Sequence, residues 1–236
     1  MTTENSQHLI MLDFDGTLVP LVDHPDAIQV PKELTPTLEA LQSSGHAVYI
    51  ITGRSRESIQ KHLPNTKTPI IGLHGLEWPD GSLENRHEML DKAFSKLNLL
   101  AQAHSGSLLE DKKLCLAFHT RRVLESKQEA LSKRVISIMR DFADESLEVL
   151  VGNKVVELRP KRANKGHAVQ TLIKKHASFH PIYIGDDTTD EDAFKVVNSH
   201  GTSIRVGPAE IPTHAEQRLP SVQAVYEYLH KSLTPR

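Results

Sequence analysis

The sequence predicts an α/β fold in which a doubly wound parallel sheet is interrupted by a smaller α+β unit. At both ends of the 236-residue chain, short apolar runs alternate with helical patterns. Strands buried on both faces have continuous apolar sequences, and alternation with helices implies parallel strands joined by right-handed crossovers. From about residue 81 to 160 the order changes to helix, strand, strand, helix, strand, strand. We therefore expect a core domain from residues 1–80 with 161–236, and a second domain from residues 81–160.

The first part of the core contains strands that end in polar residues. Residues 9–12 are apolar throughout, and charge follows directly at Asp13. The first expected helix has Leu34 and Leu38 on one face and is ended by Gly45. The expected elements are strands at 9–12, 47–51 and 69–72 and helices at 33–44 and 57–63.

The inserted part has helical periodicity first, with Leu90, Phe94 and Leu97 in register, and then two strand-like pieces. The same sequence of elements repeats once and ends in a hairpin closed around Gly152-Asn153. The inserted domain is therefore expected to be an αββαββ unit. Its helices are expected at 88–104 and 125–142 and its strands at 107–110, 113–121, 147–151 and 155–159.

Beyond Pro160 the alternation of helix and strand resumes, which predicts that the chain returns to the parallel sheet. The strand expected at 181–184 is again followed by acidic residues. The remaining elements are helices at 165–176, 191–197 and 222–229 and a strand at 203–206.

Composition excludes several classes of protein. The net charge of -2 gives no electrostatic reason to expect nucleic acid or an acidic membrane surface as a partner. The lone Cys115 excludes an internal disulfide framework and a cysteine-rich zinc site. No apolar run approaches the roughly 18–20 residues of a membrane helix, and the run after His8 is too short for a signal-peptide core. A cytoplasmic enzyme or binding protein is expected.

The first of four polar clusters is Asp13-Phe14-Asp15-Gly16, at the end of the first strand. In an open parallel sheet this edge is where ligands bind. Asp13 can attack phosphorus and form an aspartyl-phosphate, while Asp15 can protonate the leaving oxygen and then activate water. The alternative is a tight acidic turn without chemistry.

Two further clusters could hold a phosphoryl group. Thr52-Gly53-Arg54 follows the second strand and would supply a hydroxyl and backbone N–H groups, with glycine allowing close approach. Lys165 begins a helix, where a lysine is unfavourable unless an anion lies beside it. Taken alone, the first is most often a simple turn and the second a solvated lysine.

The fourth cluster is Asp186-Asp187 with Asp190, after the strand at 181–184. Carboxylates in this position suit Mg²⁺, which prefers oxygen ligands and takes phosphate oxygens and waters as well. Asp13 and Asp15 would complete the ligand set, Asp15 through its backbone carbonyl. Helix capping is the alternative, and it accounts for one acidic residue rather than three.

The order of these clusters decides between the alternatives: a carboxylate pair, a hydroxyl, a lysine and an acidic pair. Catalysis of phosphoryl transfer is mostly positioning and charge stabilisation, and this set provides both. The competing G-x-x-x-x-G-K-[ST], H-E-x-x-H and G-x-S-x-G motifs are absent from the sequence. The residues therefore predict phosphotransfer through an aspartate.

The four clusters resemble the motifs of the haloacid dehalogenase (HAD) superfamily. In that superfamily a second aspartate two residues on, as at Asp15, goes with phosphatases and mutases. The inserted αββαββ domain resembles the larger cap type, and its place after the second motif agrees. The resemblance implies a HAD-like core and a cap domain that determines substrate specificity.

A sharper resemblance is to trehalose-6-phosphate phosphatases, and it spans about residues 8 to 230. It rests on Glu110-x-Lys112, His119-x-Arg121, Val155-Val156-Glu157-Leu158-Arg159-Pro160 and Lys165-Gly166, on Gly72-Leu73-His74-Gly75 with Glu77, on Gly185-Asp186-Asp187-Thr188-Thr189-Asp190-Glu191, and on Ser203-Ile204-Arg205-Val206-Gly207 with Thr213 and Ala215. It implies Mg²⁺-dependent hydrolysis of trehalose 6-phosphate. It also implies, as a possible partner, a trehalose-phosphate synthase to which the enzyme would be functionally coupled.

The resemblance also assigns site residues. Asp13, Asp15, Asp186 and Asp187 would hold Mg²⁺, with Asp13, Asp15, Thr52 and Lys165 in catalysis. The substrate would be bound by Gly53, Arg54, His74, Glu110, Lys112, His119, Arg121 and Glu157.

The pattern of the cap strands agrees with a sugar site, because His119 and Arg121 share one strand face, and Glu157 and Arg159 another. Charged and polar side chains gathered on one sheet face suit sugar hydroxyls, which donate and accept hydrogen bonds. A solvated sheet face is the alternative from this pattern alone.

Two rival functions remain open. The nearer one is a HAD phosphatase or mutase acting on sucrose phosphate, mannosyl phosphoglycerate or mannose phosphate, and the farther one is a non-catalytic sugar-phosphate sensor.

Overall fold

The chain forms two compact units in the computed structural model, which describes residues 7–22, 27–81 and 86–233. Met1–Gly81 and Asn164–Arg236 make up one unit, here called the core unit, and Ser82–Ala163 the other, here called the cap unit. The predicted start of the cap at residue 81 falls beside residues 82–85, which lie outside the described residues.

The core unit contains a six-stranded sheet in which every pairing is parallel. Strand β1 (His8–Leu12), which ends just before Asp13, is central, with β2 (Ala47–Ile51) on one side and β8 (His180–Gly185) on the other. The strands, in their order across the sheet, are β10 (Gln217–Leu219), β9 (Thr202–Val206), β8 (His180–Gly185), β1 (His8–Leu12), β2 (Ala47–Ile51) and β3 (Ile70–Ile71).

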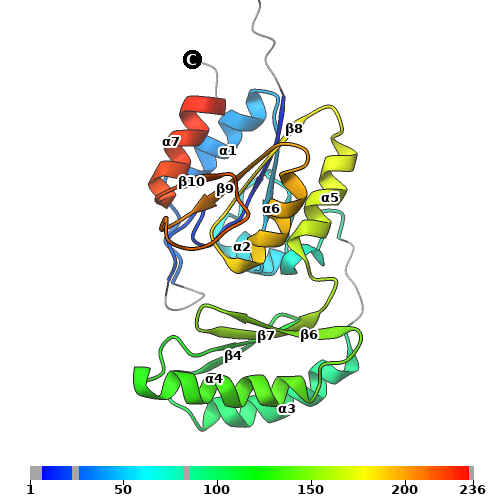
Figure 1. The fold of residues 1–236 in the computed structure, drawn as a ribbon, viewed down its shortest axis with the longest axis vertical. Helices are drawn as coiled ribbons and strands as arrows, with labels where there is room; N and C mark the ends of the chain where they lie inside the picture. The colour runs from blue at the N-terminus through cyan, green and yellow to red at the C-terminus, as the bar shows by residue number, and fades with distance from the viewer. Residues whose placement is uncertain (1–6, 23–26, 82–85, 234–236) are drawn as a thin grey trace, which may run out of the picture. The chain divides into compact units, whose positions relative to one another are not determined.

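Helices cover both faces of this sheet, because alternate residues of each strand point to opposite sides. Ile10 and Leu12 pack with α1 (Leu34–Ser43) and α7 (Val222–Leu233). Leu9 and Met11 pack with α5 (Lys165–Lys175) and α6 (Glu191–Val197). Figure 1 shows α1 beside α7 and α5 beside α6. The core helices are α1 (Leu34–Ser43), α2 (Arg56–His62), α5 (Lys165–Lys175), α6 (Glu191–Val197) and α7 (Val222–Leu233). The doubly wound sheet is confirmed.

The cap unit is an antiparallel sheet with two helices packed on one face (Figure 1). Leu116, Phe118, Val156 and Leu158 point to the helices and form the centre of its hydrophobic core. In chain order its elements are α3 (Glu88–Gln102), β4 (Leu108–Asp111), β5 (Leu116–His119), α4 (Glu125–Arg140), β6 (Leu147–Gly152) and β7 (Val155–Pro160). The αββαββ prediction is confirmed.

Local details differ from the sequence-based expectation. The hairpin turn is Asn153-Lys154 rather than Gly152-Asn153, because Gly152 pairs with Val155. Strand β5 starts three residues later than expected, since Lys113 adopts φ 67°, which extended strands do not use. Two short 3₁₀ turns, η1 (Leu73–Gly75) and η2 (Thr188–Asp190), were not expected. No helix among the described residues has the length and apolar character needed to span a membrane.

Candidate active site

The candidate active site is built around a buried ion pair between Asp13 and Lys165. The backbone N–H of Asp13 donates to the carbonyl of Ile184 at 2.9 Å, which places this residue at the carboxyl end of β1. Lys165 is the first residue of α5, whose N-terminus is capped by Asn164. Lys165 Nζ lies 2.8 Å from Asp13 Oδ1, so the anion expected beside this lysine is present.

Asp190 fixes the lysine from the opposite side. Its Oδ1 accepts from Lys165 Nζ at 2.7 Å and from the Tyr183 hydroxyl at 2.6 Å. Its Oδ2 accepts from the backbone N–H groups of Asp186 at 3.0 Å and Asp187 at 2.9 Å. Asp190 is fully buried. These four bonds identify it as a positioning residue that holds both Lys165 and the loop after β8.

The sequence placed Asp190 in the acidic cluster but gave it no role of its own, and it missed Tyr183. A signal was available for the aspartate. Asp187 and Asp190 form a capping box over η2, a pairing of residues three apart that can be recognised in sequence. The alternative interpretation expected a cap on the helix that starts near Glu191, but the capping box lies over η2, and α6 itself has no side-chain cap.

Three carboxyl groups meet close to Lys165. One oxygen each of Asp13, Asp186 and Asp190 lies within 4.8 Å of the others. Burial, and then repulsion from Asp190, raises the pKa of Asp13 despite the nearby lysine. Burial and Asp13 raise the pKa of Asp186 in the same way. One lysine thus faces three carboxyl groups, an arrangement that suits a divalent cation.

The donor set fits Mg²⁺ best at Asp13 and Asp186, because the oxygens of Asp190 already accept four hydrogen bonds. The loop after β1 comes close to them: a Cβ on Gly16 would lie 2.1 Å from Asp186 Oδ2. Gly16 also has φ +76°, so glycine is required there on both counts. Of the predicted ligands, Asp15 and Asp187 lie outside the close carboxylate group found among the described residues.

Asp15 turns its carboxylate toward Arg54. Arg54 Nε donates to Oδ2 at 2.7 Å and Nη2 to Oδ1 at 2.8 Å, a two-point contact between planar groups. The side chain of Asp15 remains 28% exposed, in contrast to Asp13 at 6%. The structure therefore brings the predicted acid–base residue together with a predicted substrate-binding residue.

The remaining core residues lie in one loop cluster after β2 and β3. Thr52 is buried, and its Oγ1 accepts from the N–H of Arg54 at 3.1 Å. The backbone N–H of His74 donates to the carbonyl of Thr52 at 2.9 Å. A Cβ on Gly53 would lie 2.6 Å from His74 Cε1, so the imidazole ring packs directly on this glycine. His74 thus lies next to the predicted phosphate-binding loop.

The cap unit gathers four predicted residues on the sheet face that points away from its helices. Lys112 Nζ lies 2.6 Å from Glu157 Oε1, and His119 Nε2 lies 3.0 Å from Glu110 Oε2. Burial alone would lower the pKa of Lys112, but Glu157 and Glu110 outweigh it and raise that pKa. The side chains of Lys112 and Glu157 are only 9% and 8% exposed, unlike a freely solvated face. Arg121 instead donates to the Asn153 carbonyl at 3.1 Å.

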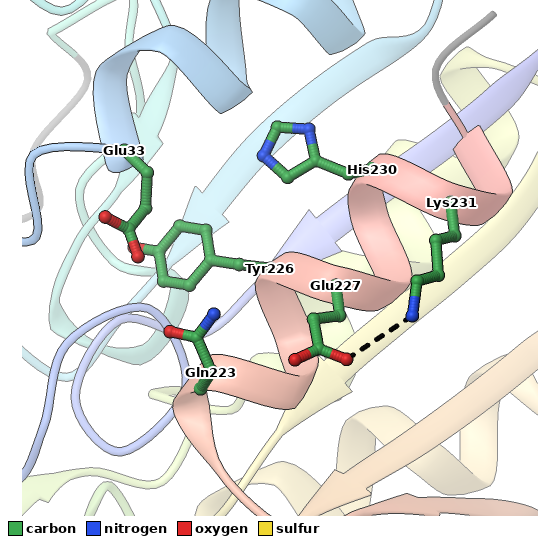
Figure 2. A pocket seen from close by; sticks show the side chains of 6 residues that line it. All are labelled: Glu33, Gln223, Tyr226, Glu227, His230 and Lys231. Atoms are coloured by element: carbon green, nitrogen blue, oxygen red, sulfur yellow. Dashed lines mark ion pairs between the residues drawn. The ribbon is translucent and has the colours of Figure 1, made fainter. Parts of the chain in front are cut away.

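A separate surface hollow of about 320 Å³ lies along α7. Figure 2 shows its lining side chains, including an exposed pair in which Lys231 Nζ lies 3.5 Å from Glu227 Oε2. None of the predicted site residues lines it. The lining residues are Glu33, Gln223, Tyr226, Glu227, His230 and Lys231.

Comparison with known proteins identifies the family. The family model described as trehalose-phosphatase matches residues 11–223. The chain belongs to this family. It is 36% identical over 233 residues to a probable trehalose-phosphate phosphatase of Sinorhizobium fredii, covering 95% of this chain and 87% of that one. It is 30% identical over 252 residues to trehalose-phosphate phosphatase B of Arabidopsis thaliana, covering 97% and 67%. This family member is therefore a phosphatase.

Solved structures agree with this assignment. The C-terminal domain of Candida albicans trehalose-6-phosphate phosphatase superposes with a TM-score of 0.84 at 25% identity, covering 95% of this chain and 91% of that one. A phosphatase of the HAD superfamily from Bacteroides thetaiotaomicron has a TM-score of 0.64 at 15% identity, covering 98% and 96%. The second likeness shows the fold alone, and it confirms the HAD-like architecture.

Proposed function

We propose that this phosphatase hydrolyses trehalose 6-phosphate to trehalose and phosphate, with Mg²⁺, through an aspartyl-phosphate on Asp13. The observation that carries the mechanism is the buried Asp13–Lys165–Asp190 network beside Asp186, at the carboxyl edge of the parallel sheet. The substrate is supported by the names of the relatives, which are trehalose-phosphate phosphatases.

In the first step Asp13 attacks phosphorus while the bond from phosphorus to the sugar oxygen breaks. Because Lys165 holds Oδ1 of Asp13, we assign the attack to Oδ2. Lys165, the Thr52 hydroxyl and the backbone N–H of Gly53 bind the phosphoryl oxygens and stabilise their charge. Asp190 keeps Lys165 in place for this task.

Asp15 supplies and removes the proton. It protonates the departing sugar oxygen, and in the second step it takes a proton from the water that hydrolyses the aspartyl-phosphate. Arg54 orients the carboxylate by donating to both of its oxygens. Each of these oxygens accepts one bond from Arg54, so a second lone pair is left on each for the proton that Asp15 transfers.

Asp13 and Asp186 would hold Mg²⁺ with their carboxylates and Asp15 with its backbone carbonyl, with Asp187 close by. When bound, the ion offsets the negative charge between the phosphate and these carboxylates. The raised pKa values of Asp13 and Asp186 support this assignment, because burial and mutual repulsion disfavour their charged forms unless a cation is near.

The cap unit would recognise the sugar. Lys112 provides donors, Glu110 and Glu157 provide acceptors, and the His119 ring can provide either. Their hydrogen bonds to one another fix the side chains in advance, so binding orders little that is not already ordered. We propose that these residues, with Arg121 and His74, bind the substrate.

The test is phosphate release in the presence of Mg²⁺ from trehalose 6-phosphate, sucrose 6-phosphate, mannosyl phosphoglycerate, mannose phosphates and the aryl ester p-nitrophenyl phosphate. We expect a strong preference for trehalose 6-phosphate, abolished by Asp13→Asn and by chelation. A preference for another sugar phosphate would retain the mechanism and overturn the substrate. Phosphate transfer back to the sugar without release would indicate a mutase, and binding without turnover a sensor.

Coupling to a trehalose-phosphate synthase and a cytoplasmic location stay predictions that rest on the sequence. Co-purification of a synthase with the native protein would test the first, and cell fractionation the second. Neither outcome affects the proposed chemistry.

A further inference from the structure

Arg159, on β7 of the cap unit, is a buried arginine whose hydrogen bonding is incomplete. Its side chain is 6% exposed. Nε donates to Glu148 Oε1 at 2.9 Å, and Nη2 lies 2.9 Å from the same oxygen. Nη1 is buried and has no hydrogen-bond partner among the residues that the structure describes.

A buried guanidinium donor of this kind normally has an acceptor. Nearly all buried polar groups are hydrogen-bonded, and charged donors are the most costly to leave without a partner. Glu148 balances the charge of Arg159, so the acceptor that is still needed is a neutral oxygen rather than a second anion. Hydroxyl and ether oxygens of a sugar are of this class.

The position of Arg159 on the sheet agrees with that class of ligand. It is two residues from Glu157 on the same strand, so both side chains point to the face that carries Lys112 and Glu110. The residues between and before them, Leu158 and Val156, point to the helices. Residues two apart on a strand are separated by about 7 Å, roughly the width of one sugar ring.

Glu148 completes the arrangement. It lies opposite Arg159 on β6. Both of its contacts with Arg159 use Oε1, so Oε2 is placed to accept a hydrogen bond from a ligand. Because Nε and Nη2 both point at Glu148, Nη1 points to the other side of the guanidinium. One sugar oxygen could then accept from Arg159 Nη1 while a different hydroxyl donates to Glu148 Oε2.

We propose that Arg159, with Glu148, is a further sugar-binding site on the cap sheet and determines the preference for the disaccharide over simpler phosphate esters. This inference rests on the proposed function, since the ligand is the sugar part of trehalose 6-phosphate. The other explanation is that the Arg159–Glu148 pair only braces β6 against β7.

The experiment compares Arg159→Gln with the wild type on trehalose 6-phosphate and on p-nitrophenyl phosphate, which carries no sugar. We expect kcat/KM for trehalose 6-phosphate to fall about 10- to 100-fold, the effect of losing one charge-assisted hydrogen bond. The value for the aryl ester should stay within about twofold. Product inhibition by trehalose should weaken by the same factor as kcat/KM for trehalose 6-phosphate falls. Inhibition by inorganic phosphate should not change.

Lys133→Gln is the control, because Lys133 forms an ion pair with Glu129 on the exposed side of α4, in the same unit and away from the sheet face of the proposed site. This change should leave kcat/KM for both substrates unaffected. If Arg159→Gln does not fold, Arg159→Lys takes its place, because it keeps the charge but loses the planar guanidinium. It should lower kcat/KM for trehalose 6-phosphate and leave the value for the aryl ester unchanged.

Three outcomes would overturn the inference. Equal losses on both substrates would indicate a bracing role, and no loss on either would exclude a role in binding. A wild-type enzyme that hydrolyses the aryl ester without preferring trehalose 6-phosphate would overturn the proposed substrate, and the inference with it.

Discussion

Replacing Asp190 by Asn tests whether the buried network really holds Lys165. The carboxylate accepts two hydrogen bonds on each oxygen: Lys165 and Tyr183 on Oδ1, and two backbone N–H groups on Oδ2. The amide of Asn has one oxygen and one NH₂ group. The NH₂ group is a donor, so it must face two of the four groups that now donate to Asp190.

The magnitude depends on which side the NH₂ group takes. If the NH₂ group faces the backbone, the N–H groups of Asp186 and Asp187 are left without an acceptor. If it faces Tyr183, the tyrosine hydroxyl can rotate and accept a hydrogen bond from it. The second orientation is cheaper, and it removes one charged bond from Lys165, which still has Asp13. We expect a loss of about 2–4 kcal/mol in the free energy of unfolding. For a chain of this size that is about 4–16 °C in Tm.

Thermal unfolding and phosphate release should be measured on the same samples. We expect kcat to fall about 10²-fold, since Lys165 loses one of two anchors while the other catalytic groups remain. Asp192→Asn is the control: its Oδ2 accepts one bond from Asn164 at 2.9 Å, its side chain is 46% exposed, and the change should cost less than about 1 kcal/mol. An Asp190→Asn protein as stable as this control would show that the network does not carry the stability assigned to it.

The other predictions concern the acid–base residue, the metal and the C-terminal helix. Asp15→Asn should lower kcat about 10²–10⁴-fold, and near-normal turnover would exclude its assigned role. In a chelator, stability should fall as pH rises above the ordinary carboxyl pKa of about 4, because the raised pKa values of Asp13 and Asp186 let the folded state keep protons that the unfolded state releases. Added Mg²⁺ should flatten this fall in Tm between about pH 5 and 9, and identical slopes with and without the ion would argue against the site. Tyr226→Phe removes a buried bond of 2.7 Å to the Leu18 carbonyl and should lower Tm by about 2–4 °C; an unchanged Tm would mean that this bond contributes nothing.

Much of the fold and part of the site could be predicted from sequence because the relevant signals are local. Residues 9–12 are apolar up to the charge at Asp13, and that boundary alone marks a buried strand ending at a sheet edge. A lysine at a helix start is unfavourable without an anion, and the order of the four polar clusters then distinguished Lys165 from a solvated lysine. By contrast, β10 has only three residues, two of them exposed and polar, and no pattern distinguishes it from a loop.

The parts that could not be predicted depend on contacts between distant residues. Tyr183 looks like any apolar strand residue until its hydroxyl is seen on Asp190, and the pairing of Asp15 with Arg54 joins loops 39 residues apart. The alternation of β7 put Arg159 on the polar face, but only the structure shows that one of its donors is buried without a partner among the described residues.

The insertion of the cap unit into the core unit has a consequence for how the protein is made. Strand β1 leaves the ribosome early, but its neighbour β8 follows about 170 residues later, roughly 10–30 s at ordinary rates of translation. In the part of the chain that the structure describes, the cap strands pair only with one another, and they can form in the meantime. Until β8 and α5 arrive, the nascent core has the nucleophile without its lysine and an open, apolar edge at β1. The growing chain is then inactive and most prone to aggregate, and this is the stage at which a chaperone would protect it.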